Sequence, residues 1–393
     1  AERGRRPVSI GANLRRTGTQ SLVYGLGSIA GNVLGIVMLR FYTGRLHGPQ
    51  LGDVELATRL ILLFSIPARL GLIAAFLRFY YDSDDPARRR RTFTTSFWTL
   101  QATTLGIGLV VLALSPVLGP RIFTTHGQAA ALFAVMGLGI YTTVNWELAS
   151  VTYRVEHRPL AFSLNTILNL LANVALTLVF MIPLGLGALG SLLGSYVGQL
   201  LIYAFVLLQQ RRWLPSGVDR GLLRPMLAFG LPLTPSLAAI WLVTLVNRPF
   251  VRWSDGAQAL GILAVSTRIG SAVLLLVSAF QLAWPTIAYG IKDDEEARHT
   301  YAAVMRLYLA AMGWVAVGVG LVGPWLVRLL TIHHEYWSAS DSVLPISLGA
   351  PLYGAFFVAS IAVGRVKKTR STWVVTLSAA LVEIAALFLL VPA

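Results

Sequence analysis

The sequence contains no cysteine and little charge of either sign. Without Cys among its 393 residues, the chain can form neither a disulfide framework nor a thiolate metal site. Charged residues make up 12% of the chain, about half of the roughly 25% that is usual in soluble domains. This shortage excludes a water-soluble enzyme of this length.

Hydrophobic residues account for 55% of the chain, and the mean hydropathy is +0.68. They occur in blocks of about 20 to 30 residues, each long enough to cross a hydrocarbon core of about 30 Å as a helix. Because lipid cannot satisfy open backbone polar groups, such runs predict helices rather than barrel strands. The expected fold class is therefore an all-α polytopic membrane protein. Its eleven spans are 17–42, 54–81, 93–115, 129–152, 160–182, 187–208, 226–247, 259–291, 302–322, 343–363 and 372–391.

Acidic residues are scarce, since 17 Asp and Glu stand against 32 Lys and Arg, a net charge of +15. With the N-terminus on the inner side, 21 of the basic residues fall in inner segments, six in outer segments and five inside spans. The positive-inside rule then predicts a cytoplasmic N-terminus in a multi-pass protein of the cytoplasmic (inner) membrane. The excess charge also predicts an attraction to anionic membrane lipids, and no nucleic-acid partner is needed to explain it.

Two halves of the chain share a weak repeat. The segment LGDVELATRL at 51–60 matches LGILAVSTRI at 260–269, an offset of 209, and similar pairs recur in order along the chain. The offset spans six helices, an even number, so the halves should have the same orientation and be related by an axis along the membrane normal. We expect a six-helix lobe at 1–210, a cytoplasmic linker at 211–224 and a second lobe at 225–393.

The repeat also bears on the number of helices. The counterpart of the span 187–208 would lie near 396–417, beyond Ala393. Eleven spans are therefore visible and a twelfth is expected to be missing from this sequence. A protein of eleven helices is the alternative.

Several segments carry a resemblance to a known family. These are LVYGLGSIAGNVLGIVMLRFYT, LRFYYDSDDPARRRR, YRVEHRPLAFSLNTILNLLANV, LAFGLPLTPSLAAIWL and GRVKKTRSTWVV. The chain resembles the polysaccharide flippases of the Wzx type, within the MOP exporter superfamily that also holds the MATE drug exporters and the lipid II flippases. The resemblance implies two six-helix lobes that form a V and alternate access around a central cavity.

Arginines inside the predicted spans are the candidate binding residues. By helix rise, Arg59, Arg69 and Arg268 lie about 8, 22 and 14 Å into their spans, and burying each costs roughly 2.5–3.5 kcal/mol. Arg59 and Arg268 correspond in the repeat. One interpretation is a set of cationic cavity walls for an anionic headgroup, since a guanidinium offers a planar fork of donors to phosphate oxygens.

The alternative interpretation is structural pairing with the acids Asp53, Glu55 or Glu147, which could also couple transport to an ion. Further cations are predicted at the outer mouth, where ordinary interfacial anchoring is the competing explanation. These are Arg40, Arg45, Arg248 and Arg252. Pro232 and Pro235 lie inside the seventh span, where proline kinks a helix, and form the best hinge candidate beside the alternative of a static bend.

The predicted function is translocation of a lipid-linked oligosaccharide, on a polyprenyl pyrophosphate, from the cytoplasmic to the outer leaflet for cell-surface polysaccharide assembly. We expect no catalytic residue, no metal and no cofactor, with coupling to an H⁺ or Na⁺ gradient left open. Other glycan-assembly proteins are expected partners. One alternative is a MATE-type drug or cation antiporter, which needs acidic cavity residues. A second is a membrane glycan polymerase or glycosyltransferase, which needs a long catalytic loop. A third is a non-transporting scaffold.

Overall fold

The computed structural model describes residues 34–365, apart from 126, 157, 214–216, 233, 235–246 and 291–292, together with isolated positions between 378 and 389. The described residues are helical and contain no β-strand, which confirms the predicted all-α membrane fold. Residues 34–45 form a helical segment before α2. The first half continues with α2 Gly48–Ala68, α3 Leu72–Tyr81, α4 Pro86–Ile122, α5 Ala129–Val155, α6 Pro159–Met181, α7 Gly187–Gln209 and η1 Arg211–Trp213. The second half comprises α8 Arg220–Gly230, α10 Asn247–Ser254, α11 Gly256–Gly270, α12 Val273–Gly290, α13 Asp294–Leu330, η2 His334–Ala339 and α14 Ser340–Arg365.

The predicted spans agree with these helices in part. Six described helices are long and apolar enough to cross a membrane, and α2 with α3, which meet at a bend of 47°, make a seventh. The overlong eighth span is interrupted, because a turn at 271–272 separates α11 from α12. The first, seventh and eleventh spans lie largely outside the described residues.

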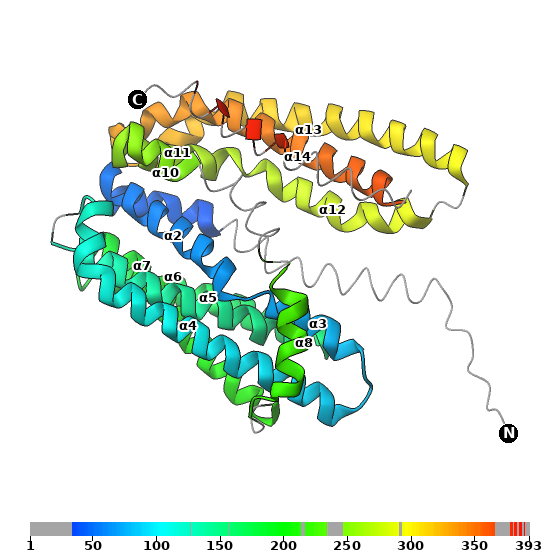
Figure 1. The fold of residues 1–393 in the computed structure, drawn as a ribbon. Coiled ribbons are helices and arrows are strands. Elements are labelled where there is room, and N and C mark those ends of the chain that lie inside the picture. The colour runs from blue at the N-terminus through cyan, green and yellow to red at the C-terminus, as the bar shows by residue number, and fades with distance from the viewer. Residues whose placement is uncertain are drawn as a thin grey trace.

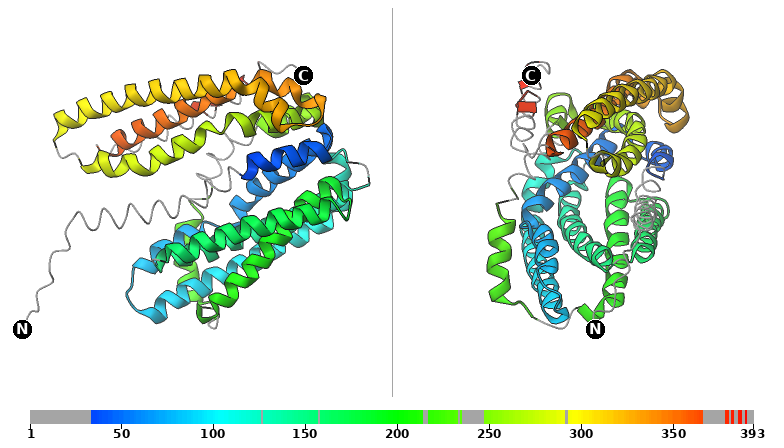
Figure 2. Two further views of the ribbon diagram at one scale, coloured as in Figure 1. Left: turned by 180° about the vertical axis from the view of Figure 1, so that it is seen from behind. Right: turned by 90° about the vertical axis from the view of Figure 1, so that its right-hand side faces the viewer.

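Two groups of helices diverge from a common end. Figures 1 and 2 show α4 to α7 on one side and α11 to α14 on the other, close together near α10 and far apart near the turn between α12 and α13. We call the first the closed end, which holds the loops at 46–47 and 123–128. The second is the open end, which holds the loop at 82–85 and the start of α13.

The closed end depends on small residues where α2 crosses α11. A Cβ at Gly52 would overlap the carbonyl of Ala257, and a Cβ at Gly261 would overlap the carbonyl of Gly48. Small residues four apart on each helix let the two backbones approach closely, as at other helix junctions in membranes. At the repeat offset of 209, Gly48 corresponds to Ala257 and Gly52 to Gly261, so each contact is the counterpart of the other. Such reciprocal contacts are typical of a two-fold axis passing between two elements.

The long helices of the two halves also correspond. Both α4 and α13 contain 37 residues, about 55 Å by helix rise, which exceeds a hydrocarbon core of about 30 Å. Asp85 accepts hydrogen bonds from the first backbone N–H groups of α4, and Asp293 caps α13 in the same way. The two helices therefore begin and end at matching positions of the repeat.

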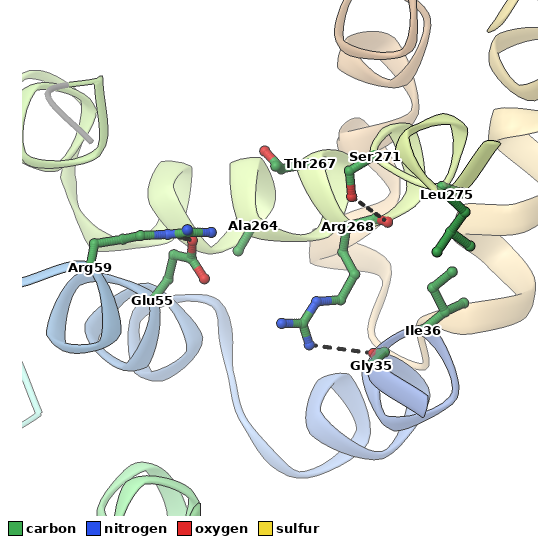
Figure 3. A pocket seen from close by; sticks show the side chains of 10 residues that line it. Gly35, Ile36, Glu55, Arg59, Ala264, Thr267, Arg268, Ser271 and Leu275 are labelled. Carbon is green, nitrogen blue, oxygen red and sulfur yellow. Dashed lines mark hydrogen bonds and ion pairs between the residues drawn. The ribbon is translucent and has the colours of Figure 1, made fainter. Parts of the chain in front are cut away.

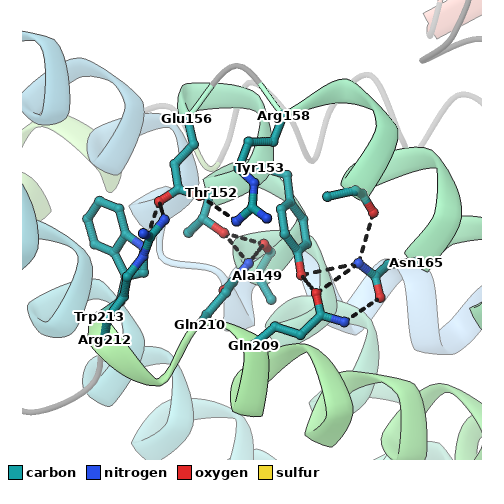
Figure 4. A network of polar contacts seen from close by, with 11 residues as sticks. Ala149, Thr152, Tyr153, Glu156, Arg158, Asn165, Gln209, Gln210, Arg212 and Trp213 are labelled. Atoms are coloured by element: carbon teal, nitrogen blue, oxygen red, sulfur yellow. Dashed lines mark hydrogen bonds and ion pairs between the residues drawn. The ribbon is translucent and has the colours of Figure 1, made fainter.

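The segment joining the two halves is anchored to the first group of helices. The carboxylate of Glu156, after α5, accepts a hydrogen bond from the Trp213 indole at 3.0 Å and pairs with Arg212 and Arg158. Beside it, the Tyr153 hydroxyl donates to Gln209 at 2.7 Å within a network that includes Asn165 (Figure 4).

The next helix continues this attachment. The backbone N–H of Asp219 donates to the Thr95 hydroxyl, and α8 packs on α3 and α4. A domain boundary at 224–225 thus stays a prediction, while the structure places all of α8 against the N-terminal group.

The α8 helix ends at the bend between α2 and α3. Leu70 and Gly71 have positive φ values of 50° and 65°, and a Cβ at Gly71 would overlap the Gly230 carbonyl. Pro232 follows in a turn rather than inside a helix, and Pro235 lies outside the described residues. The hinge remains a prediction, now with a close backbone contact beside it.

Substitution of Gly52 tests the crossing. Gly52→Ala should destabilise the protein by about 1–3 kcal/mol, the usual cost of overpacking, because its methyl group forces α2 away from Ala257. The measurement is the thermal unfolding midpoint of the purified protein.

Gly106→Ala on α4 is the matched control, since a Cβ there meets nothing within 4 Å. Alanine is the better helix former by about 1 kcal/mol, so its midpoint should stay or rise. Equal midpoints for the two variants would contradict the role given to the crossing.

Candidate functional site

A polar cavity lies just past the crossing of α2 and α11. It consists of two adjoining hollows of about 220 and 410 Å³, which share Glu55, Arg59, Ala264 and Arg268. The smaller is bounded by residues of the 34–45 segment and by the α11–α12 turn, and the larger reaches α5, α6 and α7. Both halves of the chain therefore contribute to one site.

The positions of Arg59 and Arg268 follow from the crossing. Arg59 lies seven residues after Gly52, and Arg268 lies seven residues after Gly261. Seven residues are close to two helical turns, about 10 Å, and return a side chain to nearly the same face. Each arginine therefore faces the other half of the molecule where the two helices begin to separate, as predicted for a repeat-related pair.

Glu55 neutralises part of this charge. Its carboxylate lies 2.7 Å from Arg59 Nε and 3.6 Å from Arg248 Nε, on α10 of the opposite half. Both arginines are largely buried, with side-chain exposures of 28% and 10%. A buried pair of this kind avoids the cost of an uncompensated charge. The contact of Arg59 with Glu55 is the pairing that the structural interpretation expects, whereas Arg248, predicted at the outer mouth, lies against the same carboxylate.

Arg268 differs from its counterpart. Among the described residues it has no carboxylate within 4.0 Å, and its Nη1 donates only to the Gly35 carbonyl at 3.3 Å. Figure 3 shows its guanidinium projecting from α11 into the cavity, beside Glu55 and Arg59. Among the described residues, the charged side chains that line the cavity are two arginines and one glutamate, a net charge of +1, to which the adjacent Arg248 adds another.

Asp53 and Arg252 form a second ion pair between the halves. Asp53 is fully buried, and its Oδ1 lies 3.7 Å from Arg252 Nη2. The other carboxylate oxygen accepts four hydrogen bonds from the backbone and hydroxyl groups of Thr124 and Thr125. This pair lies outside the cavity and ties α10 to the loop after α4, so it holds the closed end shut.

The remaining predicted residues lie away from the cavity. Arg69 pairs with Glu147 at 2.9 Å beside the α2–α3 bend. Arg40 is exposed and donates to the Leu329 carbonyl at the end of α13. Arg45 is exposed on the segment before α2. None of these four residues lines either hollow.

One wall of the larger hollow consists of polar residues that the sequence analysis did not identify. It is formed by Thr143 on α5, Asn173 on α6, and Ser191, Ser195, Tyr196 and Gln199 on α7. An amide inside an apolar span is costly unless it finds a partner, so Asn173 and Gln199 could have been noticed in the sequence. Attention to formal charge alone missed them.

Comparisons with known proteins agree with this architecture. Residues 45–340 match the sequence profile of a family described as "Polysaccharide biosynthesis protein". The chain belongs to this family. The match confirms the resemblance to Wzx-type flippases of the MOP superfamily. None of the curated proteins compared with the chain matches it.

Solved structures show the same fold. The chain is similar to an inward-facing multidrug resistance MATE family transporter of the MOP superfamily, with a TM-score of 0.63, 15% identity and coverage of 92% of this chain and 84% of that one. An outward-facing MATE family transporter of the MOP superfamily has a TM-score of 0.60 and 15% identity, with coverage of 95% of this chain and 88% of that one. A third structure is a MOP superfamily transporter from Pyrococcus furiosus, which is described by the reverse polarity of its binding pocket. Its TM-score is 0.55 and its identity 15%, with coverage of 97% of this chain and 99% of that one.

A double-mutant cycle tests the ion pair at the closed end. Asp53→Ala and Arg252→Ala should each destabilise the protein strongly, by about 3–5 kcal/mol for a buried pair, because each leaves one charge buried without its partner. The double variant should lose less than the sum, with a coupling of about 0.5–3 kcal/mol. Thermal unfolding of the four proteins gives the coupling. Strictly additive losses would show that the two residues do not interact.

Proposed function

We propose that this protein is a flippase that carries a lipid-linked oligosaccharide, on a polyprenyl pyrophosphate, from the cytoplasmic to the outer leaflet by alternating access. The observation that supports this best is Arg268, a guanidinium in the central cavity with no carboxylate within 4.0 Å among the described residues. A dianionic headgroup that crosses hydrocarbon unaided meets a Born cost of tens of kcal/mol. A wet cavity with net positive charge removes most of that cost.

Charge distribution supports the direction of transport. Arg88 to Arg91 begin α4 at the open end, and Arg211 and Arg212 lie in η1 at the same end. By the positive-inside rule this end faces the cytoplasm, as does the N-terminus. We therefore infer an inward-open state in the cytoplasmic membrane, with the basic residues placed where anionic lipid headgroups attract them.

The opposite state requires the closed end to open. The pairs of Asp53 with Arg252 and of Glu55 with Arg248 both join α2 to α10, so opening separates the acids from these arginines. A carboxylate freed in this way is a natural site for H⁺ or Na⁺. Asp53 is therefore the better candidate for ion coupling, because Glu55 keeps Arg59 on its own helix and Glu147 pairs with Arg69 within one group of helices.

Rival functions fit the cavity less well. A MATE-type exporter of cationic drugs needs acidic cavity walls, but the one acid lining the described cavity, Glu55, lies within reach of two arginines. Family and fold are those of MOP transporters rather than of enzymes. We propose no resident cofactor or metal, and association with other glycan-assembly proteins in the membrane.

Removal of the Arg268 charge should impair transport. Arg268→Ala should reduce translocation of a labelled polyprenyl-pyrophosphate oligosaccharide at least tenfold in reconstituted vesicles, because charge-assisted hydrogen bonds to phosphate contribute about 1.5–3 kcal/mol each. Arg268→Lys should be partly active, since it keeps the charge and loses the planar fork. Both should unfold at the parental temperature. A stable Arg268→Ala protein with the parental rate would remove the main support for an anionic substrate.

Cysteine labelling tests the orientation, and the natural absence of Cys makes the signal unambiguous. Ser271→Cys places a thiol on the cavity wall. In sealed vesicles, a membrane-impermeant maleimide applied from the cytoplasmic side should label it faster than one applied from outside. Ser254→Cys at the closed end, the last residue of α10, is the control and should show the opposite preference. Equal labelling of both thiols from one side would contradict the topology.

A further inference from the structure

The larger hollow is divided between charged and neutral polar walls. Arg59, Glu55 and Arg268 lie on the side of α2 and α11, whereas the neutral polar residues lie on α5, α6 and α7. Its volume of about 410 Å³ falls within the usual range of small-molecule sites, about 300–1,000 Å³. A single ligand held at Arg268 can therefore extend to the neutral wall.

The neutral wall has unused hydrogen-bonding capacity. Among the described residues, the Thr143 hydroxyl and the Gln199 amide make no hydrogen bond, and Oδ1 of Asn173 is buried without a partner. By contrast, Ser191 and Ser195 on the same wall donate to backbone carbonyls of their own helix. An unpaired polar group in a membrane-spanning lobe is costly. The Thr143 hydroxyl and the Gln199 amide are therefore not used to hold α5, α6 and α7 together, which leaves them for a ligand or water, whereas Oδ1 of Asn173 lies against Gly198 in the contact between α6 and α7.

The chemistry of this wall selects a neutral ligand rich in hydroxyl groups. Amides and hydroxyls both donate and accept hydrogen bonds, and they carry no charge to attract a cation or to duplicate the role of Arg268. Tyr196, on α7 between Ser195 and Gln199, adds an aromatic ring with a polar tip. A sugar ring presents alternating donors, acceptors and apolar C–H faces that such a surface can satisfy.

We propose that Thr143, Asn173, Tyr196 and Gln199 form a sugar subsite, which binds the monosaccharide next to the pyrophosphate while Arg268 binds the phosphate. The inference rests on the proposed function and adds that the sugar and the phosphate are bound by different halves of the chain. The subsite lies wholly on the first half of the chain, and Arg268 lies on the second. One headgroup thus contacts both halves at once, and its release accompanies their separation.

Two ligands separate the subsite from the phosphate site. Binding to the purified protein is measured for a polyprenyl pyrophosphate and for the same lipid carrying one N-acetylhexosamine. The parent should bind the glycosylated lipid more tightly, because the sugar completes the hydrogen bonds of the neutral wall. Combined Thr143→Val and Gln199→Leu substitutions should reduce that preference about tenfold, the value of one or two neutral hydrogen bonds, and should leave the affinity for the unglycosylated lipid unchanged.

Two controls accompany this variant. Thr142→Val is the matched change on the adjacent residue, whose hydroxyl donates to backbone carbonyls away from the cavity, and it should leave the preference intact. Arg268→Ala should weaken both lipids together. Thermal unfolding of each variant checks that it is folded.

Each outcome supports or overturns the assignment. An unchanged preference, or an equal loss for both lipids in the Thr143 and Gln199 variant, would overturn the sugar subsite and leave the proposed flippase function standing. A parent that binds neither lipid would overturn the proposed function and the subsite with it.

Discussion

The close contact between α2 and α11 is the constraint on which the site depends. Glycines at 48, 52 and 261 let the two backbones meet without intervening side chains, and this contact draws the two groups of helices together at one end. Beyond this contact the two helices separate. Arg59 and Arg268 lie two helical turns further along, on the surfaces of α2 and α11 that face each other. The cavity exists at that depth because the crossing ends there.

Ion pairs reinforce the same end. Two acids on α2, Asp53 and Glu55, pair with two arginines on α10, Arg252 and Arg248. Buried pairs add little net stability compared with apolar packing, but breaking one by removing a partner is costly. They therefore make the contact between α2 and α10 specific without making it very stable. The ion pairs of α2 with α10 and the close packing of α2 on α11 thus stabilise the same end of the molecule.

The two halves repeat their architecture and differ in their chemistry. Matching caps and equal lengths relate α4 to α13, yet α2 continues for nine residues past Arg59 before its bend, whereas α11 ends two residues after Arg268. Arg59 is neutralised by Glu55, and the corresponding position to Glu55 at the repeat offset is Ala264, which has no charge. The repeat thus places one arginine beside an acid and the other beside an alanine at the corresponding position.

The sequence by itself determined the all-helical membrane fold and pointed to the repeat and to the arginines inside spans, because each depends on local composition and spacing. It could not decide which arginines are paired. Arg248 meets Glu55, and Arg252 meets Asp53, across about 200 residues of chain, and spacing along one helix carries no information about such contacts. The sequence shows Asn173 and Gln199 as amides inside apolar spans but not the neutral wall, since Thr143, Asn173 and Gln199 lie on three helices and become one surface only when those helices pack. Tertiary structure decided the partners of each side chain, because only contacts in space set whether a polar group is satisfied or available.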